Sequence, residues 1–221
     1  MVTISPRVLS GNWNAGYALD IHTVSSTYLG DNEYGHPQYV TKRSEIGELL
    51  YRLKYNSDES ALGPIVETVV EFLRKEKWPI DIVVPVPPSR ARRFQPVLAL
   101  SKAIANSLKV ELCGDCVVKV KDTPELKNVY EFDKRLQLLE NAFDASHAKL
   151  KSRTVLLFDD LYRSGATLRS VGGVIREKGK ARAVYALTLT TSRSTRLLGF
   201  FLVAHERLGD LTRRSENAYR M

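Results

Sequence analysis

The stretch "VLLFDDLYRSGAT", residues 155–167, decides the fold. It begins as a continuous apolar run and changes abruptly at two adjacent carboxylates, Asp159 and Asp160. An uninterrupted apolar run of this length is typical of a strand in a parallel sheet that is buried on both faces. A loop containing Gly165 follows, and the apolar residues of 168–175 then have helical spacing. The stretch therefore predicts a strand, a loop and a helix, in that order.

The segments around this stretch predict the rest of the sheet. "ARAVYALTLT" (181–190) reads as a further strand that completes a βαβ unit, and "IDIVVPVPP" (80–88) reads as another buried strand stopped by prolines. Helical periodicity appears at 46–53, 65–73 and 97–108. We therefore expect the α/β class, with a central parallel sheet flanked by helices.

The N-terminal 40 residues follow a different pattern. "YALDIHTVSSTY" (17–28) alternates only partly, with Gly, Asn and Pro around it. The whole chain of 221 residues is long enough for one substantial core. We expect a small β-rich N-terminal cap at 1–40 and a main domain at 41–221.

The composition limits the classes of function. Lys and Arg number 33 against 25 Asp and Glu, a net charge of +8, which favours anionic partners without choosing between phosphates and nucleic acid. Cys113 and Cys116 have no second cysteine pair or nearby histidine, so we expect neither a zinc site nor redox chemistry there. The sequence has no signal-peptide pattern and no apolar run long enough to span a bilayer. We expect a cytoplasmic protein with no membrane partner.

The acidic pair and the loop after it match one kind of ligand. In an open α/β sheet, ligands bind beyond the carboxyl ends of the strands, where Asp159 and Asp160 are expected. A helix N-terminus favours an anion, Gly165 permits close approach of the backbone, and Ser164 and Thr167 add hydroxyl donors. Carboxylates repel a phosphate but accept hydrogen bonds from a vicinal diol, so the implied ligand is a ribose 5-phosphate. Mg²⁺ is a reasonable companion of two neighbouring aspartates.

A plainer interpretation of the same residues is a buried strand that ends in solvated acids before an ordinary turn. An isolated pair of aspartates would favour that interpretation. The full run, with Gly165 and Thr167 in register, favours the ligand site.

The stretch resembles the PRPP-binding motif of type I phosphoribosyltransferases, and residues 49–190 resemble the ComF family (competence protein F, amidophosphoribosyltransferase-like). Three further segments carry the resemblance: "LYRLKY" (50–55), "DIVVPVPPSRARRF" (81–94) and "DKRLQLLENAF" (133–143). The resemblance implies a type I phosphoribosyltransferase-like sheet. It also implies PRPP or a nucleotide as ligand and Mg²⁺ as cofactor.

The resemblance also assigns roles to residues. Asp159 and Asp160 would hold the ribose hydroxyls and the metal, and with Arg90 they would be the catalytic residues. The remaining PRPP-binding residues would be Leu161, Tyr162, Arg163, Ser164, Gly165, Ala166 and Thr167. Pyrophosphate would be bound by Pro87, Pro88, Ser89, Arg90 and Arg92. Segment 121–135, with Lys127 and Arg135, would be the flexible catalytic loop.

The sequence departs from the family pattern at three places. Arg163 and Ser164 stand where the family usually has two threonines, and "RFQP" (93–96) replaces a common Gly-Phe-Asn-Gln. Residues 1–40 contain no cysteine, so the family's N-terminal zinc module is missing. Binding of PRPP is therefore better supported than turnover.

Two functions remain open. The first is a phosphoribosyltransferase that transfers phosphoribose to or from a nitrogenous acceptor, with a link to DNA uptake or DNA metabolism. The alternative is a non-catalytic module that binds PRPP, a nucleotide, single-stranded DNA or a DNA-processing protein. A homodimer is compatible with either. A P-loop NTPase is disfavoured, because "GVIREKGKA" (173–181) lacks the Gly spacing and the Ser or Thr of that motif.

Overall fold

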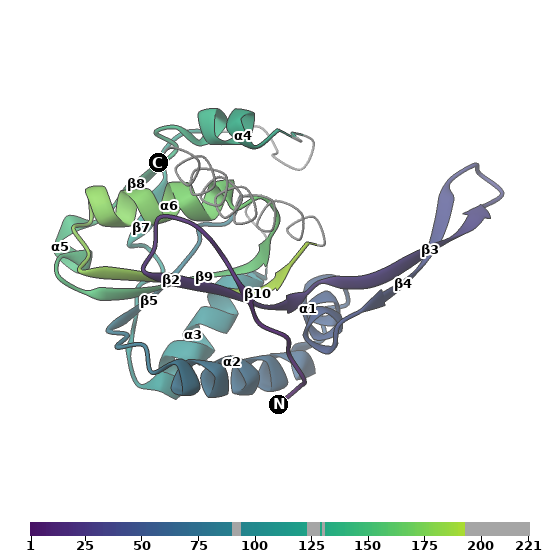
Figure 1. Ribbon diagram of the computed structural model, residues 1–221, viewed down its shortest axis with the longest axis horizontal. Coiled ribbons are helices and arrows are strands. Elements are labelled where there is room, and N and C mark those ends of the chain that lie inside the picture. Colours follow the sequence, from purple (N-terminus) through teal and green to yellow (C-terminus); the bar gives the residue numbers. More distant parts are fainter. Residues whose placement is uncertain (90–93, 123–128, 130, 193–221) are drawn as a thin grey trace, which may run out of the picture.

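The computed structural model describes residues 1–89, 94–122, 129 and 131–192, and a six-stranded sheet forms its centre (Figure 1). The strand order is β1-β2-β10-β9-β5-β6. The bounds are β1 (Arg7–Val8), β2 (Ala15–Ile21), β5 (Ile82–Pro85), β6 (Glu111–Leu112), β9 (Thr154–Tyr162) and β10 (Ala183–Thr191). All neighbours pair in parallel except β1, which is antiparallel to β2. The predicted α/β class with a central, mostly parallel sheet is confirmed.

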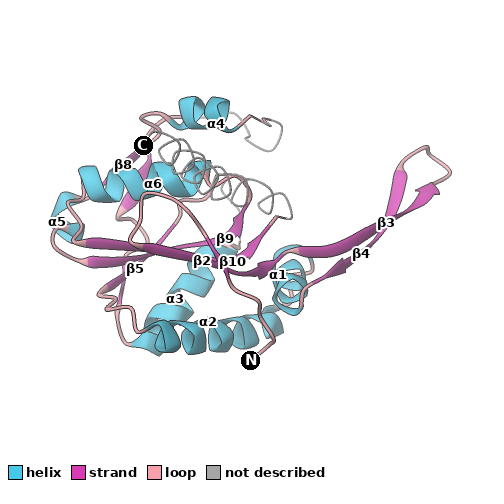
Figure 2. Ribbon diagram, in the orientation of Figure 1, coloured by secondary structure: helices cyan, strands magenta, loops and turns pink. Residues whose placement is uncertain are grey.

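Helices cover both faces of this sheet (Figure 2). On one face lie α1 (Glu45–Tyr55), α2 (Leu62–Glu76) and α3 (Pro96–Leu108), with a 3-10 turn, η1 (Glu59–Ala61), before α2. On the other face lie α6 (Ala166–Glu177), α5 (His147–Leu150) and α4 (Phe132–Leu139). None of the helices within the described residues is long and apolar enough to cross a membrane.

The side chains of β9 alternate between two hydrophobic cores. Val155 and Leu157 are buried in the core under α6, whereas Leu156 and Phe158 are buried in the core under α1, α2 and α3. Successive residues of a strand point to opposite faces of the sheet. Asp159 therefore continues the α6 side, and Asp160 continues the α1 side.

The N-terminal segment contributes to two separate sheets. β2 adds a parallel strand to the central sheet beside β10. The hairpin of β3 (Thr23–Asp31) and β4 (Pro37–Arg43) instead extends away from the body (Figure 1). The expected cap at 1–40 is thus β-rich, but half of it completes the main sheet. The division of the chain at residue 40 stays a proposal.

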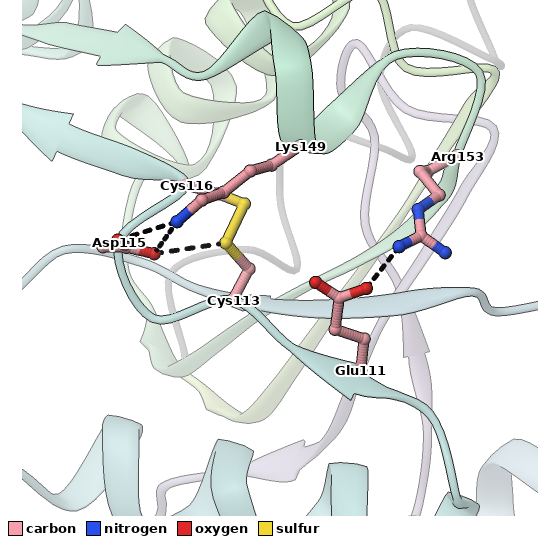
Figure 3. Close-up of a disulfide and its surroundings, with 6 residues drawn as sticks. All are labelled: Glu111, Cys113, Asp115, Cys116, Lys149 and Arg153. Atoms are coloured by element: carbon pink, nitrogen blue, oxygen red, sulfur yellow. Dashed lines mark hydrogen bonds and ion pairs between the residues drawn. A yellow bond between two sulfur atoms is a disulfide. The ribbon is translucent and has the colours of Figure 1, made fainter.

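The turn between β6 and β7 (Val117–Lys119) contains a disulfide (Figure 3). Cys113 and Cys116 lie with their Cα atoms 5.4 Å apart, within the usual range for a disulfide, and both are buried. Lys149 reaches the Asp115 carboxylate of the same turn, with 2.8 Å from its Nζ to each oxygen. The expectation of no redox chemistry at this pair is therefore wrong in one respect: the turn brings the two sulfurs together, and they are oxidised.

Beyond the disulfide, β7 pairs with β8 (Phe143–Ala145) in a small antiparallel sheet. These two strands flank the segment in which the flexible catalytic loop was expected. The described part of that segment includes α4. Lys127 lies outside the described residues.

Candidate functional site

The carboxyl ends of β5 and β9 lie side by side in the sheet. Pro85 is the register partner of Phe158, and the backbone N–H of Val86 donates to the Phe158 carbonyl over 2.9 Å. The loop after β5 and the acidic pair of β9 therefore meet at one edge of the sheet. β9 runs two residues further than expected, to Tyr162.

A first cavity of about 150 Å³ lies under the loop that joins β9 to α6. Its lining consists of Arg135, Asp159, Leu161, Tyr162, Arg163, Ser164, Gly165, Ala166, Thr167, Leu168 and Thr188. All the residues after the acidic pair that were predicted to bind PRPP, from Leu161 to Thr167, line this cavity. Thr188, which is the register partner of Asp159 on β10, was not predicted.

Gly165 gives the loop its shape. Its φ is +78°, and it is the N-cap residue of α6. A Cβ atom at this position would lie 2.3 Å from the Tyr162 hydroxyl oxygen, so a side chain cannot be accommodated without movement. The Tyr162 ring is buried and packs against the loop, which makes it a support of the loop.

Arg135 connects the predicted flexible segment to this loop. Its Nη1 donates to the Ser164 hydroxyl over 2.8 Å, and its Nε donates to the Val129 carbonyl. The side chain is buried, and burial together with the nearby Arg163 lowers the pKa of the Arg135 guanidinium. A buried guanidinium in the wall of a small cavity is well suited to a phosphate.

A second cavity, of about 220 Å³, lies between the ends of β5 and β9. Its lining consists of Lys54, Val86, Pro87, Pro88, Ser89, Gln95, Pro96, Val97, Asp159, Asp160 and Thr167. Asp159 and Thr167 line both cavities. The predicted pyrophosphate-binding residues Pro87, Pro88 and Ser89 are therefore next to the acidic pair, whereas Arg90 and Arg92 lie outside the described residues.

Lys54 is a second residue of the site, besides Thr188, that was not predicted from the sequence. It lies in the last turn of α1, and its Nζ is 2.7 Å from Oδ2 of Asp160, 106 residues along the chain. The two side chains are 18% and 13% exposed, so the ion pair is largely shielded from water. Lys54 belongs to the segment "LYRLKY" and follows Leu50 by one helical turn, at the edge of the apolar face of α1. A lysine at the edge of an apolar face is the one signal in the sequence that could have indicated a buried partner.

The two carboxylates have different electrostatic environments. Desolvation, followed by the charge of Asp160, raises the pKa of Asp159 to about 8. The backbone N–H of Asp160, 2.8 Å from Asp159 Oδ1, and the charge of Lys54 act in the opposite direction. Without a bound cation, burial and the neighbouring carboxylate therefore disfavour a second negative charge on the pair.

The two aspartates could hold a magnesium ion only if a bound ligand supplied further oxygen atoms to the ion. Within the described ranges, no group of three or more His, Cys, Asp or Glu side chains could hold a metal ion. Mg²⁺ is commonly bound by one or two carboxylates together with substrate phosphates and water. The oxygens of Asp159 and Asp160 satisfy that pattern.

The chain is similar in sequence to a known bacterial protein. It is 28% identical over 152 residues to the competence protein ComFC of Bacillus subtilis (strain 168), an alignment that covers 66% of this chain and 59% of that protein. The match confirms the resemblance to the ComF family. The aligned region spans about three fifths of that relative. No protein-family model matches the chain.

Several solved structures of low sequence identity are partly similar to this chain. Adenine phosphoribosyltransferase from Trypanosoma brucei has a TM-score of 0.46 at 12% identity, with 86% of this chain and 88% of that chain covered. The same enzyme from Saccharomyces cerevisiae has a TM-score of 0.45 at 12% identity, with 76% and 85% covered. Glutamine phosphoribosylpyrophosphate amidotransferase from B. subtilis has a TM-score of 0.44 at 17% identity, with 72% and 34% covered.

Proposed function

We propose that this chain binds PRPP and transfers phosphoribose to or from a nitrogenous acceptor. One observation carries the proposal: two cavities, one under a helix N-terminus and one beside the loop after β5, meet at Asp159 and Thr167. PRPP is a ribose with a phosphate at one end and a pyrophosphate at the other. Two neighbouring cavities that share the Asp159 carboxyl group match that shape.

The 5-phosphate would occupy the first cavity. The backbone of the loop around Gly165 and the guanidinium of Arg135 surround it there. The extra cation Arg163, which replaces a threonine of the family pattern, also lines this cavity. The ribose would then lie over Asp159, with its hydroxyls directed at the acidic pair.

The pyrophosphate would occupy the second cavity, against Pro87, Pro88 and Ser89. Arg90 and Arg92 follow directly in the sequence and would add charge. Asp159 and Asp160 would hold the magnesium ion, which supplies charge neutralisation to the leaving group when bound. These residue roles are part of the proposal.

The chemistry required of the site is separation of charge. Breaking the bond from ribose C1 to the pyrophosphate oxygen leaves positive charge on the sugar and negative charge on the leaving group. The carboxyl groups of Asp159 and Asp160 would lie on the positive side, and Lys54, which lines the second cavity, on the negative side. A nitrogen lone pair of the acceptor then forms the new bond at C1.

The experiment that tests the proposal measures two quantities on wild-type protein. Isothermal titration with PRPP and Mg²⁺ tests binding, and pyrophosphate release with a panel of bases and amines tests transfer. Binding with release supports the transferase. Binding without release from any acceptor supports the alternative, a non-catalytic PRPP or nucleotide module. Absence of PRPP binding would refute both the transferase and a PRPP-binding module.

We also propose, more specifically, that the protein binds nucleic acid. The net charge of +8 favours it, and the relative is named as a competence protein. Affinity for single-stranded DNA that falls steeply with salt concentration would support it. An affinity for single-stranded DNA that does not change with salt concentration would contradict a nucleic-acid role.

A further inference from the structure

The second cavity has an unequal distribution of charge. Asp159 and Asp160 form one wall, and Lys54 is the basic side chain among the described residues that line it. A pyrophosphate group carries several negative charges and needs cations within hydrogen-bonding reach. The described wall offers one such cation, and it comes from α1.

The position of Lys54 lets it contact both the protein and a ligand. Its ammonium group has three N–H donors, and the hydrogen bond to Asp160 uses one of them. The side chain is 18% exposed and lines the cavity, so its remaining donors lie within reach of that space. A salt bridge made only for stability would need no access to a cavity.

The register of the sheet explains why a helix 106 residues away supplies this cation. Asp160 points to the α1 side of the sheet, because Phe158, two residues before it, is buried in the core under α1, α2 and α3. The last turn of α1 ends near the same edge, and the four-carbon stem of Lys54 spans the remaining distance. Loop residues after β5 then form the opposite wall.

We propose that Lys54 binds the pyrophosphate group of PRPP, with its ammonium bridging a carboxylate oxygen of Asp160 and a phosphate oxygen of the ligand. This inference rests on the proposed function. On this account Lys54 supplies a positive charge next to the acidic pair from the protein itself, in addition to any metal ion that arrives with the ligand. It also predicts that the contribution of Lys54 is specific to the pyrophosphate end of the ligand.

The test compares three ligands by isothermal titration in the presence of Mg²⁺: PRPP, inorganic pyrophosphate and ribose 5-phosphate. Lys54→Met is expected to lower the affinity for PRPP and for pyrophosphate by about 10-fold to 100-fold, which is the usual loss for a hydrogen bond to a charged group. Ribose 5-phosphate should change by less than about threefold, since it lacks the group that Lys54 contacts. Lys54→Arg should retain most of the pyrophosphate affinity.

A matched control is Lys149→Met, which also removes a lysine from an ion pair, with Asp115; neither of these two residues lines either cavity. It should leave all three affinities unchanged. If Lys54→Met leaves an unpaired carboxylate and fails to fold, the double variant Lys54→Met/Asp160→Leu removes both charges. Its affinity for inorganic pyrophosphate is then compared with that of Asp160→Leu alone, and a further loss is expected.

The possible results separate the two claims. Equal pyrophosphate affinities in the wild type and Lys54→Met, or in the two Asp160→Leu proteins, would overturn the inference and leave the proposed function intact. A similar loss for all three ligands in Lys54→Met would also overturn it, because that pattern is expected of a purely structural ion pair. If the wild type binds none of the ligands, the proposed function fails, and the inference fails with it.

Discussion

The guanidinium of Arg135 donates to the hydroxyl of Ser164 over 2.8 Å, which links α4 to the loop before α6. The two residues are 29 positions apart and come from two segments that were predicted to have different roles, the flexible catalytic loop and the phosphate loop. Arg135 is buried in the wall of the first cavity. In the structure, the expected flexible segment and the expected phosphate loop share one cavity.

The first prediction concerns this contact. Arg135→Met should lower the affinity for ribose 5-phosphate by about 10-fold or more, because a charge-assisted hydrogen bond to the phosphate is lost. Lys134→Met is the matched control, since it removes a neighbouring cation of α4 that is exposed and paired with Glu131. Isothermal titration of both variants measures the difference. Equal affinities would place the 5-phosphate elsewhere.

The second prediction concerns the loop glycine. Gly165→Ala should lower the free energy of unfolding by about 1–3 kcal/mol, because φ is +78° and the new Cβ would meet the Tyr162 hydroxyl. Gly63→Ala is the control: it lies in α2, has open space around its Cβ position, and should be neutral or slightly stabilising. Urea unfolding measures both. Equal stability of the two variants would contradict the strained loop.

Local patterns explain how much of this architecture was predictable. The run of Val155 to Phe158 and the helical spacing after Gly165 predicted β9 and α6, because both patterns lie within one short segment. β2 was harder: its pairing with β10 joins residues about 170 positions apart, and its partial alternation resembled that of the neighbouring hairpin.

The same limit applies to the site. The acidic pair and the loop are contiguous, so the sequence revealed them together. The contacts of Asp160 with Lys54 and of Arg135 with Ser164 are made between side chains distant in the chain. No periodicity encodes such a contact, since it depends on where the last turn of α1 and the start of α4 lie against the sheet edge.

The third prediction concerns the disulfide. Reduction should lower the free energy of unfolding by about 2 kcal/mol, the loop-closure value for a four-residue ring. The double variant Cys113→Ala/Cys116→Ala is the control, and a reductant should not change its stability. Urea unfolding with and without dithiothreitol measures both proteins. If wild-type stability does not respond to complete reduction, the disulfide does not contribute to it.

The fourth prediction concerns the pH dependence of stability. The pKa of Asp159 is about 8 in the folded protein, while an aspartate in an unfolded chain titrates near about 4. Between these values the folded state binds more protons than the unfolded state, so this residue makes the protein less stable as the pH rises. Below the lower value both states are protonated, and above the upper value both are ionised, so the effect is confined to that window.

Asp159→Asn removes this titration and should be more stable than the wild type at pH 8, with a smaller difference at pH 5. Asp144→Asn is a control of opposite sign, because hydrogen bonding to Lys178 lowers the pKa of Asp144. Loss of the Asp144 carboxylate should reduce stability slightly at neutral pH. It should have no effect at a pH at which Asp144 is protonated in both the folded and the unfolded state. Urea unfolding with EDTA at several pH values measures all three proteins. A difference between Asp159→Asn and the wild type that does not grow with pH would show that Asp159 is ionised in the fold, and the acidic pair would then carry two charges at neutral pH.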